Sequence, residues 1–351
     1  MKKSLLALAV LGAFAGTASA QSSVTIYGVV DMAVAKGNGG SANNPGALGT
    51  SKAYSLIQSR ASRLGFRGNE DLGGGLSAQF HIEHRFNPDT GAASNAAHFW
   101  QGRSYVQLSS VAAGRLYMGR EYTPTFFIAN RSDPFGWDGV GQMGQGYQYA
   151  GFSNPDTIDG TAAEVGVRTS NTVGYETPSL GGFKVNGAVS LSEATQKGRD
   201  VAVSFVYAAG PIYAALGVER VYKGAMQKQG LMNAAFHYDL GVVKLMGYYA
   251  RSKTATPTTP SNVSTIPAFG VGRDTNHAVT LGALVPIGQG VVKVAYGRTD
   301  PRRDNNTRQK GAVGYDYLLS KRTTVYADAS AAKEDQRTNN KALALGIRHV
   351  F

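Results

Sequence analysis

Apolar and polar residues alternate with a period of two through most of this chain, and the alternation breaks into segments of about ten residues. In the last segment, KALALGIRHVF over 341–351, the large apolar residues Leu343, Leu345 and Ile347 share one parity, while Ala344, Gly346, Arg348 and Val350 share the other. A period of two is typical of a strand whose two faces meet different surroundings. About ten residues is the length that a tilted strand needs to cross a hydrocarbon layer. The pattern therefore predicts strands that cross a membrane.

The segments come in pairs, joined by short turns at one end and by longer polar connections at the other. We expect about sixteen strands: one over 23–34, seven hairpins that start near residues 58, 99, 168, 199, 230, 275 and 308, and a last strand over 341–351. An even number of strands places both chain ends on one side, so the first and last strands can pair. Pairing removes the sheet edges, whose unpaired groups would cost several kcal/mol each in hydrocarbon. The sequence predicts an all-β, antiparallel transmembrane barrel with short periplasmic turns and long external loops.

The first twenty residues have the pattern of a secretory signal. Lys2 and Lys3 precede an apolar run, and the segment closes on Ala-Ser-Ala directly before Gln21. The run is too short to span a bilayer and a strand pattern follows it at once. We expect residues 1–20 to be cleaved as a signal peptide and residues 21–351 to form a single barrel domain.

Composition excludes several classes of protein. Without Lys2 and Lys3 the basic residues number 33, against 23 acidic ones, but they are scattered, whereas nucleic-acid binding proteins usually cluster them. There is no cysteine, which excludes disulfides and thiolate chemistry. After the signal no stretch approaches the ~20 apolar residues of a membrane helix, which excludes a helical bundle. We therefore expect no nucleic-acid partner and no helical membrane domain.

The longest break in the strand pattern runs over 122–164 and is rich in glycine and aromatic residues. A loop of that length in a compact domain is usually functional or disordered. The lumen of a sixteen-stranded barrel is too wide for side chains to fill, so it should hold water. We expect this third loop to fold into the lumen, because its aromatic side chains would be poorly placed in open water.

Parity also predicts which side chains enter the lumen. Arg63, Arg103 and Arg168 are expected to point inward from neighbouring strands, because their apolar neighbours must face lipid. Val167 is expected on the lipid face. The remaining lumen residues that we expect are Asp31, His81, Glu83 and Arg85 on the wall, and Asp133 and Asp138 on the third loop.

Four motifs span the chain that remains after the signal. They are SSVTIYGVVD over 22–31, SRLGFRGNEDLGGGLSAQFHIEHRF over 62–86, DPFGWDG over 133–139 and the terminal GIRHVF over 346–351. In this order and spacing they resemble the general porins of Gram-negative outer membranes, and in particular the beta-proteobacterial branch. The resemblance implies a homotrimer of sixteen-stranded barrels, each with its own pore, narrowed by the third loop.

The same resemblance implies roles for individual residues. The basic wall of the pore constriction falls on Arg63, Arg103 and Arg168, and its acidic residues are Glu83 on the wall and Asp133 and Asp138 on the loop that opposes it. Phe351 corresponds to the assembly signal that the barrel-assembly machinery reads on the C-terminal strand. Outer-membrane lipid and lipopolysaccharide are the other implied partners, and no cofactor is implied.

The function implied is passive diffusion of small hydrophilic solutes and ions through a water-filled pore in the outer membrane. Guanidinium groups stay protonated and can replace part of the hydration shell of a passing carboxylate or phosphate. With more basic than acidic candidates at the constriction, we expect a preference for anions and small anionic or polar solutes. Shortening Arg103 to alanine is expected to raise conductance and weaken that preference.

Other motifs have plainer interpretations. His81 and His84 of HIEH project to opposite faces of a strand, so they cannot share a metal ion. GNGG and EDLGGG lack the lysine and hydroxyl residue of a phosphate loop, so we interpret them as turns.

Two further functions stay open as alternatives. A barrel enzyme, a lipase or protease, would need an inward serine beside a histidine, but the inward His81 has Glu83 and Arg85 beside it, so we expect no enzyme. An adhesion or phage-attachment role would use the loop over 252–274, which is rich in threonine and proline. Solute flux in a liposome-swelling assay separates the channel from both.

Overall fold

The computed structural model describes residues 23–42, 49–96, 98–149, 152, 167–191, 199–223, 227–254, 274–301 and 306–351. The predicted signal segment, residues 1–20, and most of the loop over 252–274 lie outside them. The described residues include two helices, α2 (Pro124–Arg131) and α3 (Gly144–Gln148), and both are short. Within the described part of the chain, no helix combines the length and the apolar character that a membrane span requires.

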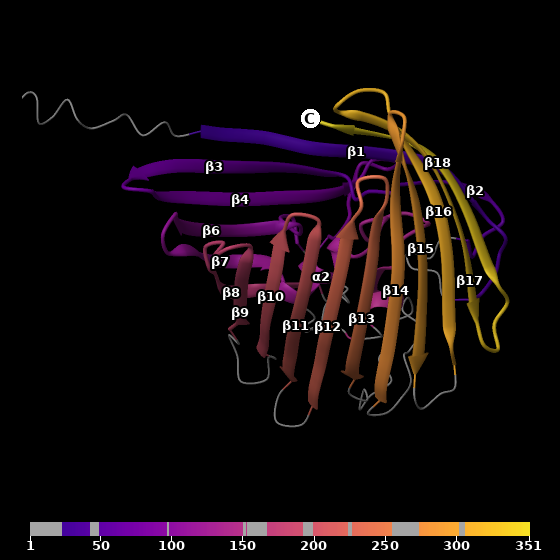
Figure 1. Ribbon diagram of the computed structural model, residues 1–351. Helices are drawn as coiled ribbons and strands as arrows, with labels where there is room; N and C mark the ends of the chain where they lie inside the picture. Colours follow the sequence, from indigo (N-terminus) through magenta and orange to yellow (C-terminus); the bar gives the residue numbers. More distant parts are fainter. Residues whose placement is uncertain are drawn as a thin grey trace, which may run out of the picture.

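Sixteen antiparallel strands form the closed wall of a barrel, as the sequence predicts (Figure 1). They are β1 (Ser23–Gly37), β3 (Arg63–Gly73), β4 (Leu76–Asn87), β6 (Arg103–Ser110), β7 (Gly114–Tyr122), β8 (Arg168–Glu176), β9 (Phe183–Ser190), β10 (Arg199–Ala209), β11 (Ile212–Lys223), β12 (Gln227–Asp239), β13 (Lys244–Thr254), β14 (Asp274–Ile287), β15 (Gly290–Pro301), β16 (Arg308–Leu318), β17 (Thr323–Glu334) and β18 (Asn340–Val350). Two shorter strands, β2 (Tyr54–Ile57) and β5 (Ala92–Ala93), lie in connections and pair with β1 and β4. The predicted first strand, seven hairpins and last strand are all confirmed.

The barrel closes where β1 meets β18. Their register runs from Val29 opposite Val350 to Gly37 opposite Ala342. Next to this ladder the backbones of Gly28 and Phe351 exchange two hydrogen bonds, of 2.9 and 3.1 Å. A Cβ atom on Gly28 would lie 2.7 Å from the backbone oxygen of Arg63 on β3 as well as 2.3 Å from the Phe351 ring, so this position favours glycine. The last strand is therefore a segment of the wall.

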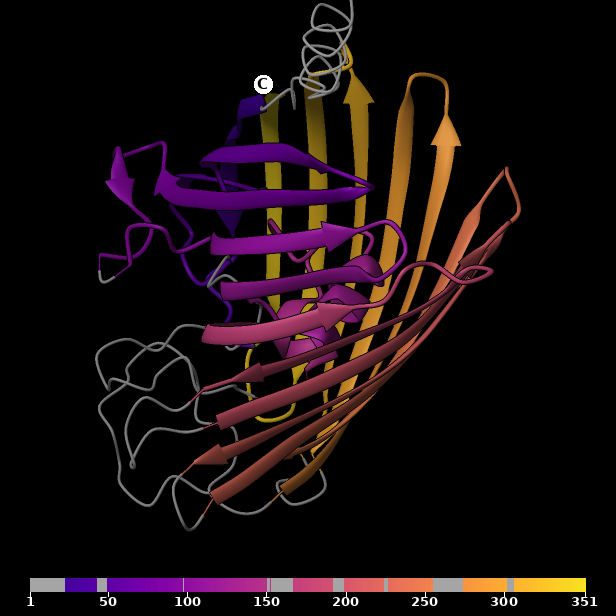
Figure 2. The same ribbon diagram turned by 90° about the vertical axis from the view of Figure 1, so that its left-hand side faces the viewer.

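Short turns join the strands of the predicted hairpins at one end of the barrel. The turns that join β10 to β11 and β12 to β13 are short, and Figure 1 shows them at the top of the barrel, toward the end where the C-terminus lies. In Figure 2 the strands β3, β4 and β6 of one wall run at a large angle to those of the opposite wall. Such an angle follows from the tilt that strands must adopt when a sheet closes into a barrel.

Burial along the strands confirms the alternation. On β18, Leu343 and Leu345 are 60% and 67% exposed, whereas Ala342 and Ala344 are 3% and 1% exposed. Outward apolar side chains cover the other strands too, which is the surface that lipid requires. The prediction that Val167 faces lipid is wrong: its side chain is 6% exposed and packs with the buried side chains inside the barrel. The reason is that β8 begins only at Arg168, so strand alternation does not extend to Val167.

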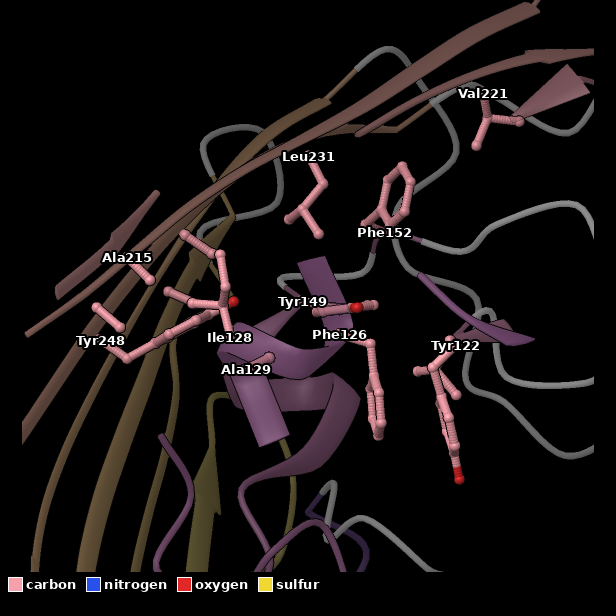
Figure 3. Close-up of a cluster of buried hydrophobic side chains, with 14 of the residues drawn as sticks. Tyr122, Phe126, Ile128, Ala129, Tyr149, Phe152, Ala215, Val221, Leu231 and Tyr248 are labelled. Carbon is pink, nitrogen blue, oxygen red and sulfur yellow. The ribbon is translucent and has the colours of Figure 1, made fainter. Parts of the chain in front are cut away.

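The third loop folds into the lumen, as predicted. Helix α2 packs against β10, β11 and β12, and α3 packs against β14 and β15. Figure 3 shows Phe126, Ile128 and Ala129 of α2 beside wall residues such as Leu231 and Tyr248. Burial of these apolar side chains holds the helix on the inner face of the wall.

Hydrogen bonds with polar wall residues also hold the third loop in place. Thr123 caps α2, since its hydroxyl accepts a hydrogen bond from the Phe126 amide at 3.4 Å, and Pro124 follows it at the first helical position. Five further side-chain contacts join loop and wall: Asn233 Nδ2 to the Thr125 carbonyl (2.9 Å), Ser132 Oγ with His237 Nε2 (2.9 Å), Thr280 Oγ1 to the Tyr147 carbonyl (3.1 Å), Thr299 Oγ1 to the Gly146 carbonyl (2.7 Å) and Lys310 Nζ to the Gln142 carbonyl (2.6 Å). The wall partners come from β12, β14, β15 and β16, so the loop is anchored along its length.

Substituting Gly297 with valine is expected to loosen the loop. A Cβ atom at Gly297 would lie 2.8 Å from both Met143 Sδ and Tyr147 Cβ, at the point where α3 meets β15. Overpacking of this kind costs about 1–3 kcal/mol. We expect a lower unfolding temperature and a higher single-channel conductance, measured on the same purified protein. Gly311→Val is the matched control, because a Cβ at Gly311 meets nothing within 4 Å; equal effects of both substitutions would contradict the contact.

Candidate functional site

A cavity of about 910 Å³ lies between the third loop and the wall. Phe127 and Trp137 of the loop and Tyr326 of the wall contribute to its lining. Its charged lining residues are Arg60, Arg63, Arg67, Arg85, Arg103, Arg168, Lys293 and Arg348, with Glu83, Asp133, Asp138, Asp316 and Asp328. The eight basic side chains outnumber the five acidic ones, so the cavity is positive.

Glu83 is an acidic residue on the inner face of β4, and its side chain is buried. Its carboxylate accepts a hydrogen bond from Arg85 Nε at 2.8 Å and another from the Tyr27 hydroxyl at 2.8 Å. Arg63 Nε lies 3.9 Å from the same carboxylate. Glu83 therefore lies on the basic wall, where it offsets one of the two positive charges of its arginine neighbours.

Arg103 is paired within its own wall. Its Nε lies 3.2 Å from the carboxylate of Glu121, which is 3% exposed. The guanidinium also lies over two aromatic rings, 5.2 Å from the centroid of Tyr122 and 5.8 Å from that of Phe127. The ion pair and the rings fix the position of Arg103, and Glu121 balances its charge.

Arg168 has a neutral partner instead. Its Nη2 donates a hydrogen bond to the Tyr122 hydroxyl, and its guanidinium lies 4.2 Å from the centre of that ring. Arg85 Nη2 donates to the same hydroxyl at 2.8 Å. Tyr122 thus contacts three arginines at the start of the loop: Arg85, Arg103 and Arg168. It is a site residue that the sequence did not indicate.

Replacing Tyr122 with phenylalanine tests this arrangement. Arg85 and Arg168 would lose the acceptor that fixes them, while the ring would keep its stacking on Phe126 at 4.3 Å. Hydrogen bonds to charged groups are worth about 1.5–3 kcal/mol, so both guanidinium groups should gain mobility. We expect higher open-channel current noise in single-channel records. The reversal potential in a salt gradient should stay the same, since no charge is removed; a large shift would contradict a purely positioning role.

Asp133 lies at the boundary between the cavity and the interior of the loop, and it is 4% exposed. Its carboxylate oxygens accept hydrogen bonds from the backbone amides of Phe135 (3.0 Å), Trp137 (3.1 Å), Met143 (2.8 Å) and Gly144 (3.4 Å). Trp137 has a φ of 66°, a left-handed conformation that is uncommon outside glycine. The carboxylate therefore holds the turn of the loop.

Asp138 is the loop carboxylate that faces the arginines. Its Oδ1 accepts a hydrogen bond from the Ala61 amide at 3.3 Å, which ties the loop to the segment before β3. Loss of water around the carboxyl raises the pKa of Asp138, and the nearby guanidinium groups of Arg85 and Arg60 oppose that rise. Arg60 lines the cavity here and was not indicated by the sequence.

The remaining predicted residues occupy different positions. His81 points inward, where its ring contacts the hydroxyls of Tyr27 and Tyr105. His84 is on the opposite face, stacked on Phe99 with ring centres 4.2 Å apart, so the two histidines do not meet. Asp31 is fully buried; its Oδ1 accepts hydrogen bonds from the Tyr326 hydroxyl at 2.6 Å and the Ser59 amide at 2.8 Å.

A second charged group lines the same cavity from the last four strands. Lys293 Nζ lies 2.6 Å from Asp316 and 3.1 Å from Asp328, and Arg348 Nη2 lies 3.3 Å from Asp316. Lys293 also lies over the ring of Phe135 on the loop, 4.8 Å from its centre. Parity along β15 and β18 could have indicated these residues, because their neighbours Val294 and Ile347 are exposed.

Comparison with known proteins agrees with this geometry. A sequence profile described as Gram-negative porin matches residues 7–337. Outer membrane porin protein 32 of Delftia acidovorans is 34% identical over 360 residues, covering 99% of this chain and 93% of that protein. An outer membrane porin protein of Bordetella pertussis is 31% identical over 403 residues, covering all of both chains.

Solved structures give the same result. The anion-selective porin from Comamonas acidovorans superimposes with a TM-score of 0.75 at 28% identity, covering 94% of this chain and all of that one. A Salmonella typhi OmpF structure shares the fold, with a TM-score of 0.67 at 12% identity. Sequence and barrel together indicate an outer-membrane channel rather than an enzyme. The chain belongs to the Gram-negative porin family.

Proposed function

We propose that this porin is an anion-preferring pore for small hydrophilic solutes, with the selective step in the cavity beside the third loop. The observation that carries the proposal is the excess of basic over acidic side chains in the lining. The relative from Comamonas acidovorans is itself described as anion-selective, which supports the same preference here. The basic wall consists of Arg63, Arg103 and Arg168. Its positive charge is partly offset by the carboxylates of Asp138 and Glu83.

The mechanism is passive. An anion that enters the cavity exchanges part of its hydration shell for guanidinium donors, which stay charged at every relevant pH. Binding must stay weak for conduction, and the acidic neighbours limit the depth of the potential well. A cation meets a net positive field in the same cavity and is disfavoured.

Single-channel recording of the purified protein in a planar bilayer tests the proposal. In a salt gradient the reversal potential should report anion preference. The preference should shrink at 1 M salt, because the Debye length falls from about 10 Å at 0.1 M to about 3 Å. A clear cation preference at low salt would overturn the proposal.

Further proposals rest on the resemblance to general porins. The chain is expected to act as a homotrimer in outer-membrane lipid and lipopolysaccharide, after removal of residues 1–20. Phe351, whose backbone pairs with Gly28 at the barrel closure, is the expected recognition point for the barrel-assembly machinery. Three equal conductance steps in single-channel records would support the trimer.

A further inference from the structure

The third loop lines the cavity with aromatic rings as well as with negative charge. Four aromatic side chains of the loop contribute to the lining, Phe126, Phe127, Phe135 and Trp137, against two carboxylates. One of the two carboxylates, that of Asp133, is 4% exposed and accepts hydrogen bonds from four backbone amides of the loop itself. Most of the side-chain surface that the loop offers to a solute is therefore aromatic.

Phe127 and Trp137 keep part of their surface for a solute. Both are half-buried, because each packs against the buried cluster of Figure 3 and also lines the cavity. Trp137 stands edge-on to Phe126 and to Tyr149, with ring centres 5.0 Å apart in each pair. Since packing inside the barrel holds the two rings, their cavity surface is in place before a solute arrives.

The cationic groups of the cavity lie directly beside these rings. The guanidinium of Arg103 lies 5.2 Å from the ring centre of Tyr122 and 5.8 Å from that of Phe127. The ammonium group of Lys293 lies 4.8 Å from the ring centre of Phe135. One small molecule in the cavity can therefore touch a cation and an aromatic surface at the same time.

The size of the cavity suits an organic solute. Its volume of about 910 Å³ falls within the range of roughly 300–1,000 Å³ that is usual for sites of small organic molecules. An inorganic anion can use only the charges of the lining. An aromatic carboxylate can in addition place its ring against the loop rings, edge-on or offset, and against a guanidinium plane.

We propose that, among the anions that the cavity admits, small aromatic carboxylates are preferred. The carboxylate binds at Arg103 and Arg168, and the ring packs against Phe127 and Trp137. Contact with the solute is transient, as conduction requires. This inference names a solute class for the anion-preferring pore proposed above, and it rests on that proposal.

Block of the chloride current through the purified protein in a planar bilayer tests the preference. The probes are benzoate and cyclohexanecarboxylate, which have the same charge and the same number of carbon atoms, but only benzoate has a flat aromatic ring. We expect benzoate to interrupt the current at a concentration about three- to tenfold lower, because contacts between rings add to the attraction between charges. Benzylammonium, which joins a ring to a positive charge, should block about tenfold more weakly than benzoate.

Three variants separate the ring from the charge. Phe127→Leu removes a ring and keeps an apolar side chain, so the blocking concentration of benzoate should rise about three- to tenfold, while that of cyclohexanecarboxylate stays within about twofold. Arg168→Gln should weaken the block by both acids to a similar extent. Phe205→Leu removes an exposed ring from the outer face of β10, so it is the matched control and should behave as the wild type does.

Equal block of the wild-type channel by benzoate and cyclohexanecarboxylate would overturn the preference, and that comparison depends on no variant. Unchanged benzoate block in Phe127→Leu would overturn it too, as would block by benzylammonium as strong as that by benzoate. The same records keep the two proposals apart. Anion-preferring chloride currents without a preference for benzoate would refute only the aromatic solute class, whereas absent or cation-preferring currents would refute the proposed pore.

Discussion

Replacing Arg168 with glutamine is expected to lower the anion preference of the pore about four- to tenfold. The charge of Arg168 enters the cavity beside a phenol, Tyr122, and no carboxylate of the described chain lies within 4.0 Å of it. A unit charge about 5 Å from a passing ion is worth on the order of 1 kcal/mol in a water-filled pore, where the effective dielectric stays close to that of water. Each 1.4 kcal/mol is tenfold in an equilibrium, which sets the size of the effect.

The double variant Arg103→Gln/Glu121→Gln is the matched comparison. It also removes an arginine of the cavity lining, but it removes the carboxylate 3.2 Å away with it, so the net charge of the wall is unchanged. We expect its anion preference to stay within about twofold of the wild type. The contrast isolates charge from side-chain volume, since both variants shorten an arginine at the same cavity.

Reversal potentials in a tenfold potassium chloride gradient give the measurement for both variants. Anion preference in Arg168→Gln should fall most at low ionic strength, where screening is weakest. Equal losses in the two variants would contradict the argument, because they would mean that removal of arginine volume sets the preference. No loss in either would place the selective step outside this cavity.

Much of the fold is predictable because a closed barrel in lipid allows few solutions. Every strand must satisfy its backbone groups through neighbours and must present apolar side chains outward, so a two-residue period fixes both the strand and its inner face. Arg63 and Arg103 are found inside for that reason. The paired β1 and β18 follow from the same requirement, since an open edge would be costly in hydrocarbon.

Strand alternation does not predict the positions of residues that lie outside regular strands. Arg60 lies between β2 and β3, and Tyr122 lies where β7 ends and the loop begins, so strand alternation says little about either. The pairing of Arg103 with Glu121 depends on which strands are neighbours and on local register. A bulge between β7 and β8, near Gly119, shifts that register by an amount that periodicity does not reveal.

The sequence could predict only part of the placement of Lys293 and Arg348. Parity along their strands gives their inward direction, but only the closed barrel places them on the same cavity as the arginines of β3, β6 and β8. The sequence likewise indicates that Asp133 belongs to the loop near the pore. It does not reveal that four backbone amides converge on its carboxylate, because such turns depend on backbone conformations at Gly136 and Trp137.

Replacing Asp133 with asparagine is expected to release the third loop and raise single-channel conductance. The carboxylate of Asp133 accepts hydrogen bonds from four backbone amides, and the amide group of asparagine offers only one oxygen to them. Each buried N–H left without an acceptor costs about 1–3 kcal/mol. The anchors of α2 on the wall stay in place, so the segment from Pro134 to Gly144 should move most.

Asp138→Asn is the control that distinguishes release of the loop from the removal of a negative charge. Both substitutions remove one negative charge from the cavity lining, and each should therefore strengthen anion preference to a similar extent. Asp138 accepts a hydrogen bond from a single backbone amide, that of Ala61, so its loss leaves the turn of the loop intact. We expect higher conductance, more current noise and faster liposome swelling with larger sugars only for Asp133→Asn. If both variants conduct alike, the third loop keeps its shape without Asp133, and the width of the pore depends on the wall anchors instead.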